Sequence, residues 1–366
     1  MRKEAIMAPK VLVFAPTGDS HKFLEQNGCE VQLGNPQWHV PGGDYEAEYI
    51  SMAKGAVALA GSSMRATPTS RRVLQALPDL RIVAKATVGV DDIDIEAASE
   101  LGVLVTHAPV ESNWGNIAET TVMFMLSLLK GQMIQDTTIK EGGWWTEGRQ
   151  GAYVGSRNSD GYKGITLGIV GLGRIGGRVA HLMRPWNINI LASDPYIPEY
   201  RFLEFGVQPV DLETLLRESD VVTIHVVLNK ETKHMISARQ IEMMKPTSYL
   251  INTARGGAVN ELDLINALEK GTIAGAALNA YEEEPLPPES PLRFMGNKVI
   301  MRPHGGSPLR TTGPEAPAGR GAGQNSQWVN NDILKALKGE TPEHVFNAEA
   351  LPLWLERFKG KDLFVH

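Results

Sequence analysis

The stretch ITLGIVGLGRIGGRVAHLM, residues 165–183, decides the fold of this chain. It begins with an apolar run typical of a buried strand and ends in a segment with helical periodicity. Between them stand Gly171, Gly173 and Gly176 at GxGxxG spacing. Glycines so placed let the backbone turn tightly and approach a pyrophosphate, which lies at the positive end of the helix. The motif alone is weak, but its position between strand and helix predicts a dinucleotide site.

A second apolar run, NINILASD at 187–194, ends in Asp194. At this point of the fold a carboxylate accepts a hydrogen bond from the adenosine 2′-hydroxyl and repels a 2′-phosphate. The alternative is that Asp194 only starts the turn DPYIP. The first interpretation predicts NAD rather than NADP as the cofactor. The loop residues expected to bind it are Gly171, Gly173, Arg174, Ile175 and Gly176.

Short apolar runs alternate with helix-like segments along the whole chain, which is typical of doubly wound parallel sheets. A first series of runs lies at 10–15, 29–33, 56–61, 81–87 and 102–109. A second series lies at 165–171, 187–194, 220–227, 248–252, 272–281 and 298–301. Two such series predict an α/β protein with two lobes and a cleft between them.

Helix boundaries are marked at several points of the second series. Asp211 and Asn260 are expected N-caps, and Gly271 is expected to end the helix that Asn260 begins. Glycines and prolines make 311–327 a poor helix former, and helical periodicity returns only at 328–340.

Composition limits the classes of function. The chain has 366 residues, of which 42% are hydrophobic and 21% charged, and its net charge is −6. With no Lys/Arg block, a nucleic-acid partner is not expected. Cys29 is the only cysteine, so no internal disulfide is possible and a reducing compartment fits. Residues 1–10 lack the apolar core of a signal peptide, and the apolar stretch 117–130 is too short for a membrane span. We therefore expect a cytoplasmic enzyme or binding protein with neither a membrane partner nor a metal.

Three runs of the second series are each followed by an ionisable group: Arg255 after 248–252, Glu282 to Glu284 after 272–281, and His304 after 298–301. The ligand of an open parallel sheet lies outside the carboxyl ends of its strands, so these groups are expected to converge beside the nicotinamide. A lone histidine can be structural, Arg255 could bridge surface loops, and the glutamates could form a solvated turn. Their equivalent positions favour a shared site.

This trio suits hydride transfer to a 2-keto acid. Arg255 can hold the substrate carboxylate and polarise the keto oxygen through its fork of donors. His304 can give a proton to the forming alkoxide, or remove it in the oxidation direction. A neighbouring carboxylate favours the imidazolium and is expected to raise the pKa of His304.

The motifs TLGIVGLGRIG, SDVVTIHVVLNKETKHMI, INTARGG, AGAALNAYEEEP and RPHGG resemble, in order and spacing, those of the D-isomer-specific 2-hydroxyacid dehydrogenases. The likeness covers nearly the whole chain. It implies Arg255, Glu284 and His304 as the catalytic set. It also implies that Val88 and Gly89, within KATVGVDDID, bind the substrate carboxylate through their backbone amides. The further cofactor contacts that it implies are Thr253, Ala254 and Asn279.

The resemblance also implies an organisation. Residues 10–113 and 324–366 would form a flavodoxin-like substrate domain, and residues 114–323 a Rossmann NAD-binding domain. The chain would form a homodimer in which the helix near 117–130 helps to pair the NAD-binding domains.

Four departures from the family pattern stand out. Asn279 replaces the usual Asp, Val227 a Pro, and Arg302 a common Thr. A cation at Arg302 would oppose a raised pKa of His304 unless it points away. The segment 311–327 is normally helical in relatives.

Two other functions remain open. Formate dehydrogenases share the pattern but carry Gln in place of the Glu that pairs with the histidine, so Glu284 argues against that activity. NAD-sensing regulatory proteins of the same fold retain the Arg, Glu and His set, and the motifs do not exclude them.

Overall fold

The computed structural model describes residues 8–365 apart from 17, 41, 145–150 and 306–319. They form two compact units. The five-stranded unit takes its residues from the segments before 114 and after 306, and the seven-stranded unit is formed by residues 114–306. Each unit is an α/β layer structure with a fully parallel sheet.

The five-stranded sheet has the order β2-β1-β3-β4-β5, which is the flavodoxin-like order. Its strands are β1 (Lys10–Ala15), β2 (Glu30–Leu33), β3 (Ala56–Gly61), β4 (Ile82–Lys85) and β5 (Leu104–Thr106). Its helices are α1 (Lys22–Gln26), α2 (Glu46–Ala53), α3 (Arg71–Gln75), α4 (Ile95–Glu100), α12 (Arg320–Leu337) and α13 (Leu351–Phe358), with short 3₁₀ turns at Pro36–His39 and Ala348–Ala350.

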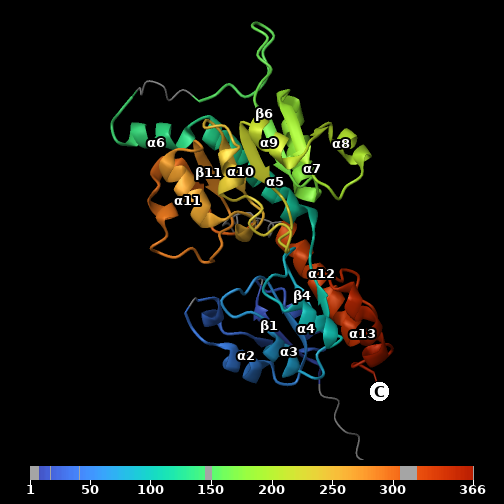
Figure 1. The fold of residues 1–366 in the computed structure, drawn as a ribbon. Helices are drawn as coiled ribbons and strands as arrows, with labels where there is room; N and C mark the ends of the chain where they lie inside the picture. The colour runs from blue at the N-terminus through green and yellow to red at the C-terminus, as the bar shows by residue number, and fades with distance from the viewer. Residues whose placement is uncertain (1–7, 17, 41, 145–150, 306–319, 366) are drawn as a thin grey trace, which may run out of the picture. The chain divides into compact units, whose positions relative to one another are not determined.

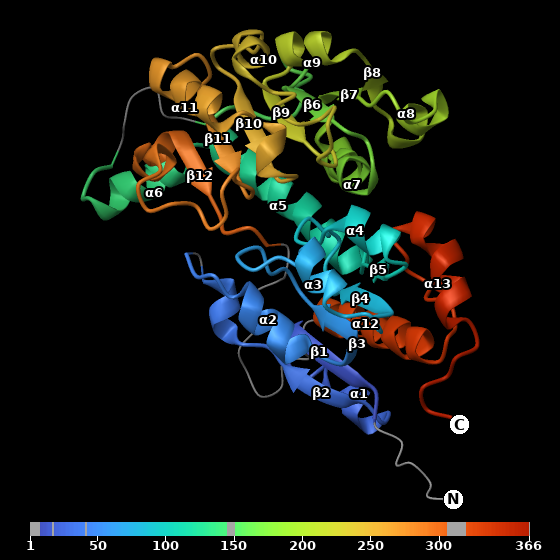
Figure 2. The same cartoon turned by 60° about the horizontal axis from the view of Figure 1, so that its bottom comes forward.

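Alternate residues of β1 belong to two separate cores, because successive side chains of a strand point to opposite faces of the sheet. Leu12 and Phe14 pack with α2, α3 and α4 on one face of the sheet. Val11 and Val13 pack with side chains of α1, α12 and α13 on the other face. Figure 2 shows α12 beside strands β3 and β4 of this sheet. The second core therefore joins the beginning and the end of the chain.

The seven-stranded sheet has the order β12-β11-β10-β9-β6-β7-β8, and the direction of winding reverses between β6 and β9. Its strands are β6 (Thr166–Val170), β7 (Asn189–Ser193), β8 (Gln208–Pro209), β9 (Val221–Ile224), β10 (Tyr249–Asn252), β11 (Gly275–Leu278) and β12 (Val299–Met301). Side chains of α5 (Glu111–Leu129), α7 (Arg174–Met183) and α8 (Glu199–Phe205) join the core on one face. Those of α9 (Leu212–Glu218), α10 (Ala238–Glu242) and α11 (Glu261–Lys270) join the core on the other (Figure 1). The remaining elements are α6 (Gln132–Lys140) and 3₁₀ turns at Arg184–Trp186, Gly256–Ala258, Pro291–Phe294 and Gly296–Lys298.

The predicted fold class is confirmed, and every expected apolar run contains a strand. The predicted caps are also confirmed. The Asp211 carboxylate accepts from the Thr214 amide at 2.8 Å, and the Asn260 side chain accepts from the Asp263 amide at 3.1 Å. Gly271 ends α11 with a φ of +71°. The two-residue edge strand β8 was not predicted, because Gln208 and Pro209 are both exposed and carry no apolar pattern.

The prediction of poor helix formation across 311–327 is wrong for its second half. Helix α12 begins at Arg320, whereas residues 311–319 lie outside the described part of the chain. Packing overrides the low helix propensity here. The Asn325 side-chain amide donates to the Ala86 carbonyl at 3.0 Å, and Ser326 is buried.

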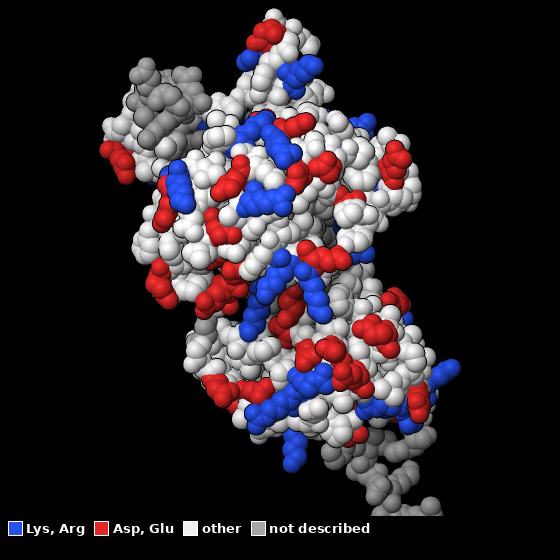
Figure 3. Space-filling view, in the orientation of Figure 1, with Lys and Arg blue, Asp and Glu red and all other residues white. Residues whose placement is uncertain are grey.

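Lysines and arginines are interspersed with acidic side chains on the face shown in Figure 3. None of the helices in the described ranges has both the length and the apolar character needed to cross a lipid bilayer.

Candidate active site

The glycine loop between β6 and α7 is shaped by two glycines that no other residue could replace without a shift. Gly171 has a φ of +89°, and a Cβ there would lie 2.9 Å from the His225 carbonyl oxygen. A Cβ at Gly176 would lie 2.1 Å from the Gly171 carbonyl oxygen. At Gly173, the N-cap of α7, a Cβ would meet nothing within 4 Å, and no side chain caps the helix. The loop thus leaves open space beside the first amides of α7, as a bound pyrophosphate requires.

Asp194 stands at the end of β7 and is tied to this loop. One carboxylate oxygen accepts from the Leu172 amide at 2.8 Å, and the other accepts from the Tyr196 amide at 3.0 Å. The bond from the Tyr196 amide closes the turn that the alternative interpretation of Asp194 requires. The bond from the Leu172 amide holds the carboxylate beside the glycine loop, where the ribose interpretation needs it. The two roles are therefore compatible in one side chain.

His304 and Glu284 are in direct contact. His304 Nδ1 lies 2.7 Å from Glu284 Oε1, and the two side chains are 27% and 11% exposed. The same carboxylate oxygen accepts from the Tyr281 amide at 2.9 Å, so the backbone fixes the acid that orients the ring. With Nδ1 engaged, Nε2 is the nitrogen that could exchange a proton with a substrate.

Arg255 is held by a residue that the sequence analysis overlooked. The Asn252 side chain, at the end of β10, donates to the Arg255 carbonyl at 2.9 Å and accepts from the Ala254 amide at 3.1 Å. The Arg255 guanidinium donates to the Ala254 carbonyl at 2.9 Å. An Asn at the end of a buried strand is a signal for such a side-chain turn and could have been used. Because β10, β11 and β12 are neighbours, Arg255, Glu284 and His304 follow the carboxyl ends of adjacent strands.

Asn279, directly after β11, provides a second test of the cofactor site. It is 1% exposed, and its Oδ1 is buried with no hydrogen-bond partner in the described part of the chain. Buried acceptors are rarely left unpaired. A carboxamide N–H of a nicotinamide ring would satisfy it. Thr253 and Ala254, which follow the neighbouring strand β10, are also buried, and the Thr253 hydroxyl contacts that of Thr121 on α5 at 2.9 Å. These residues and the glycine loop therefore fit a nicotinamide dinucleotide.

Two departures from the family pattern, Arg302 and Val227, differ in their surroundings. The Arg302 guanidinium donates to the Thr120 hydroxyl on α5 at 3.1 Å, and the Arg302 carbonyl accepts from the Tyr281 hydroxyl at 2.8 Å. Burial raises the pKa of Tyr281 to about 12, so this hydroxyl keeps its proton. The side chain of Arg302 is thus held by α5. Val227, in place of a proline, is 75% exposed.

The loop after β4 carries Val88 and Gly89 in the five-stranded unit. The Val88 carbonyl lies 3.0 Å from His107 Nδ1, and the Gly89 carbonyl accepts from the Thr87 hydroxyl at 2.8 Å. The amides of Val88 and Gly89 donate to no acceptor among the residues that the structure describes. Two unpaired amides in one tight loop are suited to binding a carboxylate.

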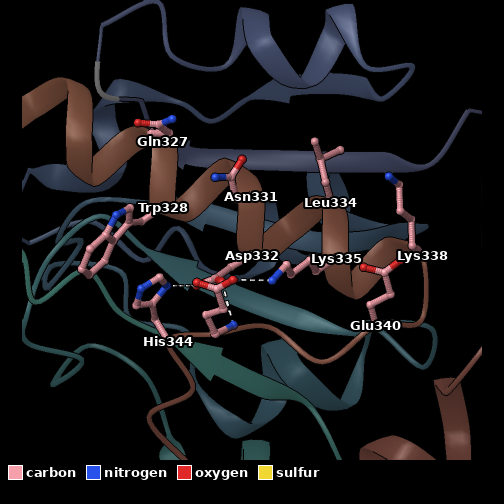
Figure 4. Close-up of a pocket in the computed structure, with 10 residues that line it drawn as sticks. Gln327, Trp328, Asn331, Asp332, Leu334, Lys335, Lys338, Glu340 and His344 are labelled. Carbon is pink, nitrogen blue, oxygen red and sulfur yellow. Dashed lines mark hydrogen bonds and ion pairs between the residues drawn. The ribbon is translucent and has the colours of Figure 1, made fainter.

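A depression of about 450 Å³ lies elsewhere in this unit, along α12 and the segment after it (Figure 4). Its buried Asp332 accepts from the Glu343 amide at 3.0 Å and lies 3.0 Å from His344 Nδ1. Burial raises the pKa of this carboxyl. The Trp328 and His344 rings are stacked with centroids 3.9 Å apart. These polar groups satisfy one another, so the cluster braces the C-terminal segment and holds none of the predicted site residues.

Comparisons with known proteins match this chain to 2-hydroxyacid dehydrogenases. Residues 122–306 match the family model described as D-isomer specific 2-hydroxyacid dehydrogenase, NAD binding domain. The chain is 35% identical over 345 residues to D-3-phosphoglycerate dehydrogenase from Methanocaldococcus jannaschii, covering 94% of this chain and 60% of that one. It is 32% identical over 348 residues to glyoxylate reductase from Thermococcus litoralis, covering 94% of this chain and 98% of that one. Among solved structures, D-lactate dehydrogenase from Escherichia coli matches with a TM-score of 0.70 and 26% identity, covering 92% of this chain and 99% of that one. The chain thus spans three fifths of the first relative and nearly all of the other two.

Proposed function

Because the chain belongs to the D-isomer-specific 2-hydroxyacid dehydrogenase family, we propose that it is an NAD-dependent oxidoreductase that interconverts a 2-keto acid and a D-2-hydroxy acid. The observation that carries the proposal is the 2.7 Å contact between His304 Nδ1 and Glu284 Oε1. This contact pairs the Glu284 carboxylate with the His304 imidazole beyond the carboxyl ends of β11 and β12. Both strands belong to the sheet whose glycine loop fits the cofactor. When bound, the nicotinamide supplies the hydride for reduction or accepts it in oxidation.

Each site residue has a separate task in this reaction. Arg255 binds the substrate carboxylate and keto oxygen through its planar fork of donors. His304 gives the proton from Nε2 to the alkoxide oxygen as it forms, and takes it back in the oxidation direction. Glu284 keeps the ring oriented and stabilises its protonated form. The amides of Val88 and Gly89 bind the substrate carboxylate.

The first test is a screen of NADH oxidation with glyoxylate, hydroxypyruvate, pyruvate, phenylpyruvate and 3-phosphohydroxypyruvate. The His304→Ala variant should lose about 10²–10⁴-fold in turnover, because it lacks the general acid, and should still bind NADH. His234→Ala is the matched control, since His234 also pairs with a glutamate, Glu282, on the same unit. It should retain wild-type turnover.

Two results would change the assignment. A wild-type protein that binds NADH but turns over none of these acids would support an NAD-sensing protein instead. A His304→Ala variant with wild-type turnover would remove this histidine from the mechanism.

We also propose that NAD is preferred to NADP. Support comes from the Asp194 carboxylate beside the glycine loop, since a fixed negative charge there repels a 2′-phosphate. Asp194→Ala should bring the kcat/KM values for NADH and NADPH closer together. An unchanged ratio in that variant would clear Asp194 of this role.

We further propose a homodimer that is paired through α5 and α6. Support comes from large apolar side chains that are exposed along and just beyond these helices. They are Met123, Met133, Ile139 and Trp144. A cytoplasmic location is consistent with the single cysteine of the chain.

A further inference from the structure

A buried ion pair brackets the loop that carries Val88 and Gly89. Lys85 is the last residue of β4, and Asp92 follows the loop 86–91. Lys85 Nζ lies 2.5 Å from Asp92 Oδ2, and the two side chains are 0% and 4% exposed. The ammonium also donates to the Ser62 carbonyl at 2.6 Å, and the carboxylate accepts from the Met64 amide at 2.6 Å. The pair therefore ties both ends of the loop to each other and to the neighbouring segment after β3.

Stability alone does not account for this pair. Removing two charges from water is costly, and a buried pair can often be replaced by apolar residues of similar volume without loss of stability. Burial lowers the pKa of the Lys85 ammonium, and the Asp92 carboxylate offsets part of that effect. Such a pair can instead serve to hold one backbone conformation around it.

The conformation enforced here turns the loop carbonyls toward the protein. The Ala86 carbonyl accepts from the Asn325 side chain at 3.0 Å, and the Thr87 carbonyl accepts from the Ala108 amide at 2.9 Å. The Val88 and Gly89 carbonyls are held by His107 and Thr87. With these carbonyls engaged, the amides of Val88 and Gly89 remain for a ligand.

We propose that Lys85 and Asp92 are positioning residues of the substrate site, whose ion pair keeps the Val88 and Gly89 amides oriented to bind the substrate carboxylate. The proposal rests on the proposed function, because it takes the carboxylate of a 2-keto acid as the ligand of these amides. Neither side chain touches the substrate. Both act through the backbone of the loop 86–91, because their ion pair holds the two ends of this loop together.

The test is the double variant Lys85→Met/Asp92→Leu, which removes both charges and fills their volume. Its melting temperature should equal or exceed that of the wild type. The KM for the keto acid should rise about tenfold or more, while kcat and the affinity for NADH stay near wild type, since the lost contact binds substrate and transition state alike. Hydrogen exchange of the peptide that spans the loop should become faster. Lys22→Met/Asp19→Leu removes an exposed pair of the same residue types in the same unit and should change none of these values.

Asp92→Asn provides the second variant. It keeps an acceptor for the Met64 amide but removes the charge opposite Lys85, so the KM should again rise. A folded double variant with wild-type KM would overturn the proposal. Failure of both variants to fold would also overturn the proposal, because the ion pair would then be needed for the folding of the whole five-stranded unit and not for the orientation of the loop. Absence of activity in the wild-type enzyme would instead count against the proposed function, and loop exchange would still report on the pair.

Discussion

Arg255 illustrates how a single side chain can be aimed by one neighbour. Its backbone is fixed through the two hydrogen bonds of Asn252, which is itself buried at the end of β10. A planar guanidinium that leaves this rigid turn can present two parallel donors to a carboxylate. In the proposed function, the geometry of these donors contributes to binding the substrate carboxylate beyond what the positive charge alone would give.

The corresponding prediction is for Arg255→Lys. An ammonium keeps the charge but loses the fork, so kcat/KM for the keto acid should fall about 10- to 100-fold, mainly through KM. Steady-state kinetics at saturating NADH measure this loss. The exposed Arg239, changed to Lys, serves as the control. Unchanged KM and kcat would remove Arg255 from the mechanism.

Cys29 gives a prediction about pH. Burial raises the pKa of its thiol from 9.0 to about 11, so the thiolate is scarce at pH 8. Alkylation of the native protein by iodoacetamide should be about 100-fold slower there than that of a free thiol, and should accelerate as the pH approaches 11. The unfolded protein should react at the rate of a free cysteine. Fast alkylation of the native protein would show that the thiol is ionised or accessible.

The placement of Arg255, Glu284 and His304 beyond adjacent strands was predictable because each of them follows an apolar run, and such runs reveal where parallel strands end. The residues that hold them were not. Asn252 acts on its immediate neighbours and could have been found from its turn signal. The loop that carries Val88 and Gly89 is held by Lys85 and Asp92, which contact Ser62 and Met64 after β3, and by His107 after β5, so these contacts join segments whose proximity depends on sheet order. A sequence pattern does not give that proximity without the topology.

At the scale of elements, the glycine loop determines how α7 is placed. The loop sets the distance between helix and strand at Gly176, and the space for a ligand at Gly173. These two glycines, separated by one turn, therefore have different tasks.

Alanine at each position should separate the tasks. Gly176→Ala places a Cβ 2.1 Å from the Gly171 carbonyl oxygen, so α7 must move and the free energy of unfolding should fall by about 1–3 kcal/mol. Gly173→Ala meets no protein atom and should leave the unfolding free energy of the cofactor-free protein unchanged, while weakening NADH binding. Chemical denaturation and fluorescence titration measure the two quantities. Wild-type NADH affinity in Gly173→Ala would place the cofactor elsewhere.

Elements with a strong local signal were predicted well, and those formed by packing were not. Asp211 and Gly271 mark helix ends through short-range hydrogen bonds and backbone conformation, so their sequence context suffices. Helix α12 extends through a glycine-containing segment because it packs on the five-stranded sheet. Strand β8 forms because the edge of β7 provides backbone hydrogen-bond partners for it.

At the scale of the whole molecule, the proposed homodimer leads to a prediction. Ile139→Glu introduces a charge on α6, where the wild-type side chain is 51% exposed, and should weaken dimerisation. Sedimentation velocity measures the shift toward monomer. Leu203→Glu changes a residue of α8 that is 74% exposed and should leave the dimer intact. A wild-type protein that sediments as a monomer would contradict the proposal.

The joining of both chain ends in one core has a consequence for biosynthesis. The Trp354 indole donates to the Arg81 carbonyl at 2.9 Å, and the Val105 amide donates to the Asn347 side chain at 2.7 Å. On the ribosome, residues 114–306 are therefore able to complete their unit while the earlier-made strands still wait for α12 and α13. The strands of the five-stranded sheet are thus translated well before two of the helices that cover one of their faces, and this bare apolar face is where a nascent-chain chaperone would be needed.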